Sequence, residues 1–222
     1  MIKAIIFDFD GLILDTETPW YEAFREIYEE HGAHLPIELW GLGVGTSGEH
    51  FDPYLYLGEC TGKPVVKEQI DALFTVKHGA LMELQGVREG VEDYLKEAQA
   101  KGIRIGLASS SPRAWVESYL KQHGLFEYFE VIKTADDVLR IKPDPELYLA
   151  ASEALGVAPA EAAAFEDSPN GVRAAVSAGL YSVIVPNPLT AQLAFDAYDL
   201  RLDSMADLSL GEVLKRLEQT ER

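Results

Sequence analysis

Helical and strand-like patterns alternate along the chain from about Gly90 to its end. Apolar residues recur at helical spacing in some segments and gather in short runs between them. The expected helices cover residues 91–101, 113–123, 145–155, 169–178 and 210–217, and the expected strands cover residues 104–108, 130–133, 162–165 and 181–185. This alternation predicts an α/β fold with a mainly parallel sheet and helices on both faces. Such sheets carry their chemistry at the carboxyl ends of their strands.

Between residues 16 and 86 the alternation stops and the pattern becomes helical. Two apolar faces at helical spacing consist of Trp20, Phe24, Ile27 and Tyr28, and of Ile70, Leu73, Phe74 and Leu81. We therefore expect an inserted helical domain that comes after the first strand. Such an insert suits a lid that closes over the end of that strand.

Several helix starts are marked by a capping residue followed by proline: Ser111-Pro112, Asp144-Pro145 and Ser168-Pro169. A polar side chain in the cap position satisfies backbone N–H groups of the first turn, and proline is favoured at the first helical position. These residues predict where three of the helices begin.

The first apolar run, Ile5-Ile6-Phe7, ends in Asp8-Phe9-Asp10-Gly11. Side chains two apart on an extended strand point to the same side. Two like charges ~4 Å apart repel by about 4 kcal/mol at an effective dielectric of ~20, so Asp8 and Asp10 predict a bound cation. The alternative is that Asp10-Gly11 is only a turn after a core strand.

A second pair of acids, Glu166-Asp167, repeats this arrangement after the apolar run Ala162 to Phe165. Magnesium is commonly held by one or two carboxylates with water and substrate phosphate, and two strand ends can supply them. The alternative is that Asp167 caps the next helix, but Ser168 already occupies the cap position.

Two other polar side chains stand near expected strand ends. Ser109 comes directly after the strand at 104–108. Because Ser111 is expected to cap the next helix, the hydroxyl of Ser109 is free to hold a phosphoryl oxygen. The alternative is that Ser109 only forms a turn, as serines at strand ends often do. Lys142 lies between Ile141 and Pro143 rather than in a charge run, so it can supply a fixed cation, or it can simply be solvated.

The charge balance narrows the classes of partner. The 222 residues contain 37 acidic and 19 basic side chains, a formal net charge of −18. Such a charge repels a nucleic-acid backbone and anionic membrane surfaces, so we expect neither as a partner. Cys60 is the one cysteine and no run approaches the ~20 apolar residues of a membrane span. The expectation is a soluble, cytoplasmic monomer.

Two glycine-containing segments resemble nucleotide motifs without fitting them. Residues 43–48 match the spacing G-x-G-x-x-G, but no clear strand precedes them, and Pro53 interrupts the segment where a helix would be needed. Residues 58–63 have the wrong spacing for a P-loop. We interpret both as loops of the insert.

Taken in order, Asp8-Phe9-Asp10-Gly11, Ser109, Lys142 and Glu166-Asp167 resemble the motifs of the haloacid dehalogenase superfamily, in the branch of β-phosphoglucomutase and related sugar-phosphate phosphatases. The resemblance implies a Rossmann-like core over residues 1–15 and 87–222 and a helical cap domain over residues 16–86. It also implies magnesium as cofactor and a small phosphorylated metabolite, such as a sugar phosphate, as substrate.

By the same resemblance, Asp8 is the nucleophile that forms an aspartyl-phosphate and Asp10 is the general acid and base. Magnesium is held by Asp8, the backbone carbonyl of Asp10, and Asp167 with help from Glu166. Ser109 and Lys142 complete the phosphate cradle. Trp20, Trp40, Tyr54 and Tyr56 are possible liners of the substrate pocket, although such aromatics more often fill a core.

Departures from the mutase pattern favour a phosphatase. Thr18-Pro19-Trp20 stands where the mutase carries a histidine, and the loop at residues 41–48 contains no lysine or arginine. A mutase needs a second cationic site for its bisphosphate intermediate. The alternatives are a sugar-phosphate mutase and a non-enzymatic phospho-receiver module, which would lack a lid over its site.

Overall fold

One parallel sheet with strand order β3-β2-β1-β4-β5-β6 forms the centre of the computed structural model, which describes residues 1–41 and 51–220. The strands are β1 (Ala4–Phe7), β2 (Arg104–Ala108), β3 (Val131–Lys133), β4 (Ala162–Glu166), β5 (Tyr181–Ile184) and β6 (Leu200–Arg201). Every neighbouring pair is parallel, which confirms the predicted α/β fold. The short β6 was not predicted, because two residues are too few to show a period.

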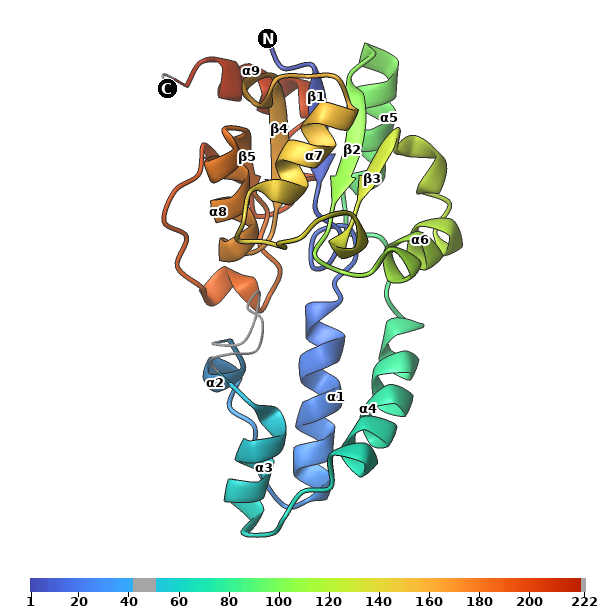
Figure 1. Cartoon of the computed structure of the whole chain (residues 1–222), viewed down its shortest axis with the longest axis vertical. Coiled ribbons are helices and arrows are strands. Elements are labelled where there is room, and N and C mark those ends of the chain that lie inside the picture. Colours follow the sequence, from blue (N-terminus) through green and yellow to red (C-terminus); the bar gives the residue numbers. More distant parts are fainter. Residues whose placement is uncertain (42–50, 221–222) are drawn as a thin grey trace.

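Helices cover both faces of this sheet (Figure 1). The helices over the sheet are α5 (Val91–Lys101), α6 (Arg113–Gln122), α7 (Glu146–Ala154), α8 (Pro169–Ala178) and α9 (Leu210–Glu218). Ile5 and Phe7 of β1 pack in one core cluster with α5, α6 and α9, whereas Ala4 and Ile6 pack in another with α7 and α8. Alternate residues of one strand thus serve opposite layers, and this burial on both faces explains the unbroken apolar run.

The strand register aligns the chemically important ends. Phe7, the last residue of β1, pairs with Leu107 of β2 and with Phe165 of β4. Asp8, Ser109 and the Glu166-Asp167 pair therefore come to the same edge of the sheet, at neighbouring strands.

Four helices lie beyond that edge (Figure 1): α1 (Glu17–Glu30), α2 (Ile37–Gly41), α3 (Pro53–Thr61) and α4 (Lys67–Met82). They share a core cluster that includes Phe24, Ile27 and Ile70, and Leu189 from the segment after β5 joins it. The helical character of this segment is as predicted, while its limits at 16 and 86 as a separate domain stay a prediction. Leu73 departs from the expected face of α4, since 39% of it is exposed.

Of the three predicted helix caps, the one at Ser168 forms at the expected position. The Ser168 hydroxyl accepts a hydrogen bond from the Gly171 N–H at 3.1 Å and caps α8. In α7 the cap position falls on Pro145, but Asp144 Oδ1 still accepts a hydrogen bond from the Glu146 N–H of the first turn at 3.1 Å. In α6 it falls on Pro112, and the Arg113 N–H instead donates to Asp136 Oδ2 at 2.9 Å. Because Asp136 caps α6 from another loop, the side chain of Ser111 is released for a different contact.

The cap of α8 gives a test of the fold. Replacing Ser168→Ala should lower the free energy of unfolding by about 1 kcal/mol, because the Gly171 N–H in the first turn loses its side-chain acceptor. Urea denaturation measures this. Ser177→Ala, an exposed position of the same helix, is the matched control, and equal effects of the two substitutions would contradict the capping role.

Candidate active site

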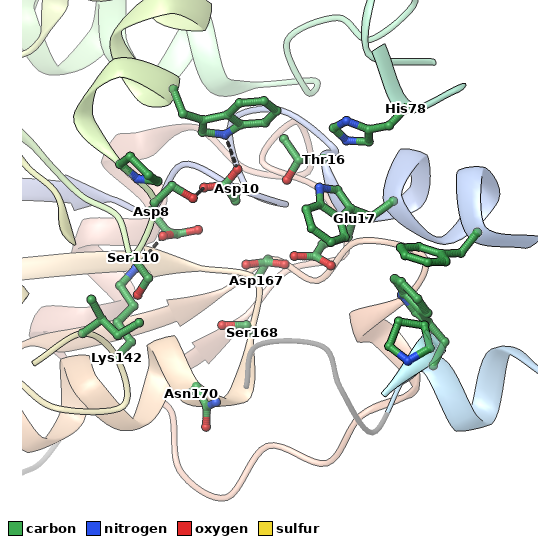
Figure 2. A pocket seen from close by; sticks show the side chains of 18 of the residues that line it. Asp8, Asp10, Thr16, Glu17, His78, Ser110, Lys142, Asp167, Ser168 and Asn170 are labelled. Atoms are coloured by element: carbon green, nitrogen blue, oxygen red, sulfur yellow. Dashed lines mark hydrogen bonds and ion pairs between the residues drawn. The ribbon is translucent and has the colours of Figure 1, made fainter. Parts of the chain in front are cut away.

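Three buried carboxyl groups meet where β1 and β4 end. Ligand oxygens of Asp8, Glu166 and Asp167 all lie within 4.8 Å of one another. Asp8 is 6% exposed and the other two are at most 1% exposed. Figure 2 shows Asp8 and Asp167 at one end of a pocket. Buried carboxylates need cations or hydrogen bonds to offset their desolvation, and this oxygen spacing fits a divalent metal with a preference for hard ligands.

Lys142 supplies one positive charge to this cluster. Its Nζ lies 2.5 Å from Asp8 Oδ1 and 2.6 Å from Glu166 Oε1, and its side chain is 6% exposed. Burial by itself would lower the pKa of the ammonium group, but attraction to Asp8 and Glu166 outweighs it and raises that pKa above the ordinary range. Lys142 is therefore a fixed cation, as predicted, and not a solvated side chain.

Glu166 connects this ion pair to the core. The Tyr148 hydroxyl donates to Glu166 Oε1 at 2.5 Å, and burial followed by the charge of Glu166 raises the pKa of Tyr148. Gly171 faces the same carboxyl group, and a Cβ there would lie 2.0 Å from its atoms. The first turn of α8 thus makes room for the Glu166 side chain.

Asp167 is positioned by a residue that the sequence motifs did not identify. Asn187 Nδ2 donates to Asp167 Oδ2 at 2.8 Å, and Asn187 is itself fixed by the N–H groups of Leu189 and Thr190. Gly11 lies against the same oxygen at a φ of +80°, and a Cβ there would be 2.2 Å from it. Only glycine fits this left-handed turn and this close approach.

Burial and mutual repulsion disfavour the ionised forms of Asp8 and Asp167. Burial raises the pKa of Asp8 well above the usual range for aspartate; the Lys142 ammonium group opposes this shift, and the charges of Glu166 and Asp10 add to it. Burial, Asp8 and Glu166 likewise raise the pKa of Asp167. A divalent cation would relieve this repulsion, so the residues present fit a metal.

Asp10 is near the cluster, but its carboxylate is directed elsewhere (Figure 2). Oδ2 accepts from the Ser111 hydroxyl at 2.6 Å and, more weakly, from Ser109 at 3.3 Å; Oδ1 accepts from the Trp115 indole N–H at 2.9 Å. The Asp10 carboxylate is not part of the three-residue oxygen cluster. The assignment of its backbone carbonyl as a ligand stays a prediction.

The expectation of a free Ser109 hydroxyl was wrong. Ser109 is fully buried, and its Oγ accepts from the Ser111 N–H at 3.0 Å in addition to its contact with Asp10. The expectation failed because it assumed that Ser111 caps α6. Ser110 instead lines the pocket, with a buried Oγ that has no hydrogen-bond partner in the part of the chain described. A role of Ser109 in phosphate binding stays a prediction.

A pocket of about 820 Å³ extends from the carboxylates towards the helices beyond the sheet (Figure 2). Its far wall is aromatic and includes Trp20, Phe24, Trp40, Tyr54, Phe74 and His78. Trp20, Trp40 and Tyr54 are thus liners as expected, and Tyr56 does not line the pocket. Of the described lining residues, Lys142 alone carries a positive charge.

Glu17 is a pocket carboxyl that the motifs did not identify. It lines the cavity at the start of α1. Figure 2 shows its side chain directed towards Asp167. Burial, with added repulsion from Asp10 and Asp15, raises the pKa of Glu17 to about 7. The sequence signal that could have identified Glu17 is its position directly after Asp15-Thr16, in the first turn of the insert.

No membrane-spanning helix occurs in residues 1–41 and 51–220. None of the helices there combines the length and the apolar character that a membrane span requires.

Comparison with known proteins identifies relatives over the whole chain. The family model described as haloacid dehalogenase-like hydrolase matches residues 2–179. YhcW of Bacillus subtilis (strain 168) is 54% identical over 217 residues, covering 98% of each protein. The phosphorylated carbohydrates phosphatase of Thermotoga maritima is 32% identical over 81% of this chain and 82% of its own. The crystal structure of CbbY from Rhodobacter sphaeroides with phosphate is 33% identical, with a TM-score of 0.72 over 94% of this chain and 96% of that one.

The repulsion within the cluster predicts how metal affects stability. An acid whose pKa is raised on folding destabilises the folded state as the pH rises from the unfolded pKa through the folded one. At pH 8 with a chelator, Asp167→Asn should therefore melt at a higher temperature than the unchanged protein, by at least the ~2 °C that 1 kcal/mol produces at this chain length.

Magnesium should then raise the melting temperature of the unchanged protein but not that of Asp167→Asn, because one ligand is gone. Asp203→Asn, at an exposed carboxyl, is the control and should keep the magnesium effect. A magnesium shift of equal size in all three proteins would contradict the assignment of this cluster as the metal site.

Proposed function

This chain belongs to the haloacid dehalogenase-like hydrolases and is a phosphoric monoester hydrolase, and we propose that it cleaves small phosphorylated metabolites with magnesium and a transiently phosphorylated Asp8. The observation that carries the proposal is the group of three carboxyls and one ammonium at the end of β1, facing a pocket of about 820 Å³. The site offers a nucleophile, a metal site and a place for a phosphate ester within one cavity.

The first step is attack of Asp8 on phosphorus. Asp8 Oδ1 accepts the hydrogen bond of Lys142, so we assign the attack to Oδ2. A bond forms between Oδ2 and phosphorus while the bond from phosphorus to the ester oxygen breaks, and protonated Asp10 gives its proton to the departing alkoxide. Asp10 lines the same pocket as Asp8, which supports this role.

The second step returns the enzyme to its starting state. Asp10 takes a proton from water, the water oxygen bonds to phosphorus, and the bond to Asp8 Oδ2 breaks to release inorganic phosphate. Magnesium, when bound by Asp8 and Asp167, supplies positive charge that screens the nucleophile from the anionic ester and stabilises the phosphoryl group in transfer. Lys142 adds a fixed cation on the Asp8 side.

The sugar-phosphate class comes from the relatives. A Thermotoga maritima relative is a phosphorylated carbohydrates phosphatase, and hexitol phosphatase B of Escherichia coli (strain K12) is 29% identical over 96% of this chain. The pocket contributes aromatic faces that pack against the C–H faces of a sugar or polyol, and Glu17 contributes a hydrogen-bonding group.

The pocket favours hydrolysis over phosphate exchange between two positions of a sugar. Lys142 is the only cation that lines it in the part of the chain that is described, and this cation is already engaged by two carboxylates. The segment at residues 42–50 contributes no lysine or arginine by sequence. A second phosphate would therefore meet no cation. The covering helices, in turn, argue against an open phospho-receiver module.

Asp8→Asn tests the nucleophile. Release of phosphate from both a hexitol phosphate and p-nitrophenyl phosphate should fall to background, because an amide does not attack phosphorus, and a chelator should do the same to the unchanged enzyme. Released phosphate is measured colorimetrically. Asp93→Asn, at an exposed position in α5, should keep full activity. Turnover by Asp8→Asn above a no-enzyme control would refute the mechanism.

The choice between phosphatase and mutase has its own test. With β-glucose 1-phosphate and a bisphosphate primer, the enzyme should yield free phosphate and glucose, because among the described lining residues no cation remains for a second phosphate. Phosphorus NMR distinguishes the products. Accumulation of glucose 6-phosphate would instead establish the mutase.

A further inference from the structure

The Asp10 carboxylate is held by an indole. Trp115 of α6 donates its indole N–H to Oδ1 at 2.9 Å, while the two serine hydroxyls go to Oδ2. We propose that Trp115 is a positioning residue for Asp10, one that fixes the direction of Oδ1 for proton transfer to the leaving group. The inference rests on the acid and base role of Asp10 in the proposed function.

The chemistry of the indole explains why this partner suits a proton-transfer group. A carboxylate oxygen has two lone pairs, and an indole N–H donates without ever accepting. Trp115 therefore occupies one lone pair of Oδ1 and cannot take up the proton that Oδ1 must carry. The serine hydroxyls can both donate and accept, and they contact the other oxygen, Oδ2. Oδ1 thus keeps one open lone pair.

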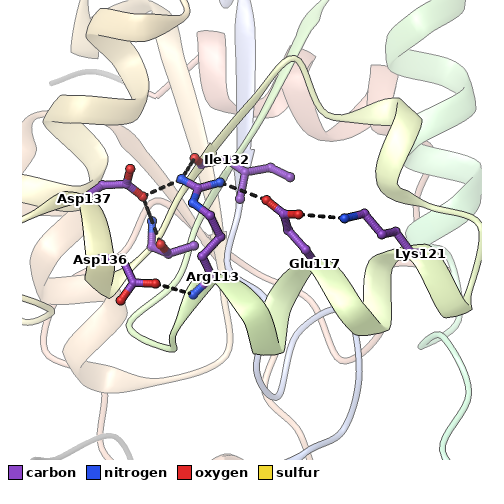
Figure 3. A network of polar contacts seen from close by, with 7 residues as sticks. Arg113, Glu117, Lys121, Ile132, Asp136 and Asp137 are labelled. Atoms are coloured by element: carbon purple, nitrogen blue, oxygen red, sulfur yellow. Dashed lines mark hydrogen bonds and ion pairs between the residues drawn. The ribbon is translucent and has the colours of Figure 1, made fainter.

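The position of Trp115 is fixed by a network at the start of α6 (Figure 3). The Arg113 N–H is capped by Asp136, and the Arg113 guanidinium donates to Asp137 Oδ2 at 2.7 Å and to the carbonyl of Ile132 at 3.0 Å. Glu117, one turn further along, accepts from Arg113 at 3.2 Å. These contacts connect the first turns of α6 to β3 and to the segment that follows it, and Trp115 of this helix then contacts Asp10.

The indole ring itself is packed from two sides. Tyr119 of the same helix meets it edge to face at a centroid distance of 4.7 Å. His78 of α4 stacks on it at 6.0 Å and 19°. Burial lowers the pKa of His78, which favours the neutral form of the ring that stacks there. Because α4 lies beyond the sheet edge, Trp115 links the helices over the pocket to Asp10.

Trp115→Phe tests the proposal, because it keeps an aromatic ring for Tyr119 and His78 and removes the N–H. The readout is kcat/KM, which covers the steps up to departure of the leaving group. A sugar alkoxide needs a proton to leave, whereas p-nitrophenolate does not. We expect kcat/KM to fall about tenfold for a hexitol phosphate and less than about twofold for p-nitrophenyl phosphate.

Two further variants separate the effect of losing the indole N–H from the effect of changing the shape of the ring. Tyr119→Phe removes only a hydroxyl, keeps the ring that packs on Trp115 and leaves the indole N–H in place, so it should leave both values unchanged. Replacing Trp115 by benzothienylalanine, which has sulfur in place of N–H and nearly the same shape, should reproduce the selective loss even where phenylalanine loosens the fold. Melting temperatures identify a variant that is merely unfolded.

The outcomes distinguish positioning from a structural role. A loss confined to the alkyl ester supports positioning by Trp115. Equal losses for both esters with benzothienylalanine, or no loss for either, would overturn it and leave the phosphatase mechanism intact. If the unchanged enzyme released no phosphate from any ester, the proposed function itself would fail, independently of Trp115.

Discussion

The structure depends on burying three carboxyl groups and one ammonium group in one place, each with an ion-pair or hydrogen-bond partner. Lys142 lies between Asp8 and Glu166, and its ammonium offsets only part of their charge together with that of Asp167. Tyr148 and Asn187 supply hydrogen bonds to the acids from the core side. The remaining negative charge faces the pocket, where a divalent cation and an anionic ester would complete the balance. This excess of buried negative charge is costly to the folded chain by itself, and it favours the binding of a cation at the site.

The parallel sheet brings these charged groups together. β1 lies between β2 and β4, so residues that are far apart in sequence leave the sheet at one edge. Two glycines leave room for the acidic side chains, because Gly11 lies against Asp167 and Gly171 lies against Glu166. The helices α1 to α4 then enclose the opposite side of the pocket with aromatic side chains. The reactive side chains thus lie at the edge of the sheet, and the aromatic side chains of the pocket lie opposite them.

The strands and the grouping of the acids could be predicted from the sequence, because both depend on local patterns of residues. The unbroken apolar runs of β1 and β4 and the acids at their ends predicted both strands and the grouping of Asp8 with Glu166 and Asp167. The contacts of Asp10 were not predictable in this way. They depend on Asp136 capping α6, which frees Ser111, and on the rotation of α6, which presents Trp115. Such tertiary contacts leave no period or spacing in the chain.

The central claim is that Asp8 becomes covalently phosphorylated, and chemical trapping tests it most directly. Enzyme mixed with substrate and magnesium is quenched with borohydride, which reduces an acyl phosphate to an alcohol, and the peptide that spans Asp8 is sequenced by mass spectrometry. The account predicts homoserine at position 8, only when substrate and metal are both present. Reduction at Asp10 or Asp167 instead, or an unmodified peptide under conditions of active turnover, would contradict it.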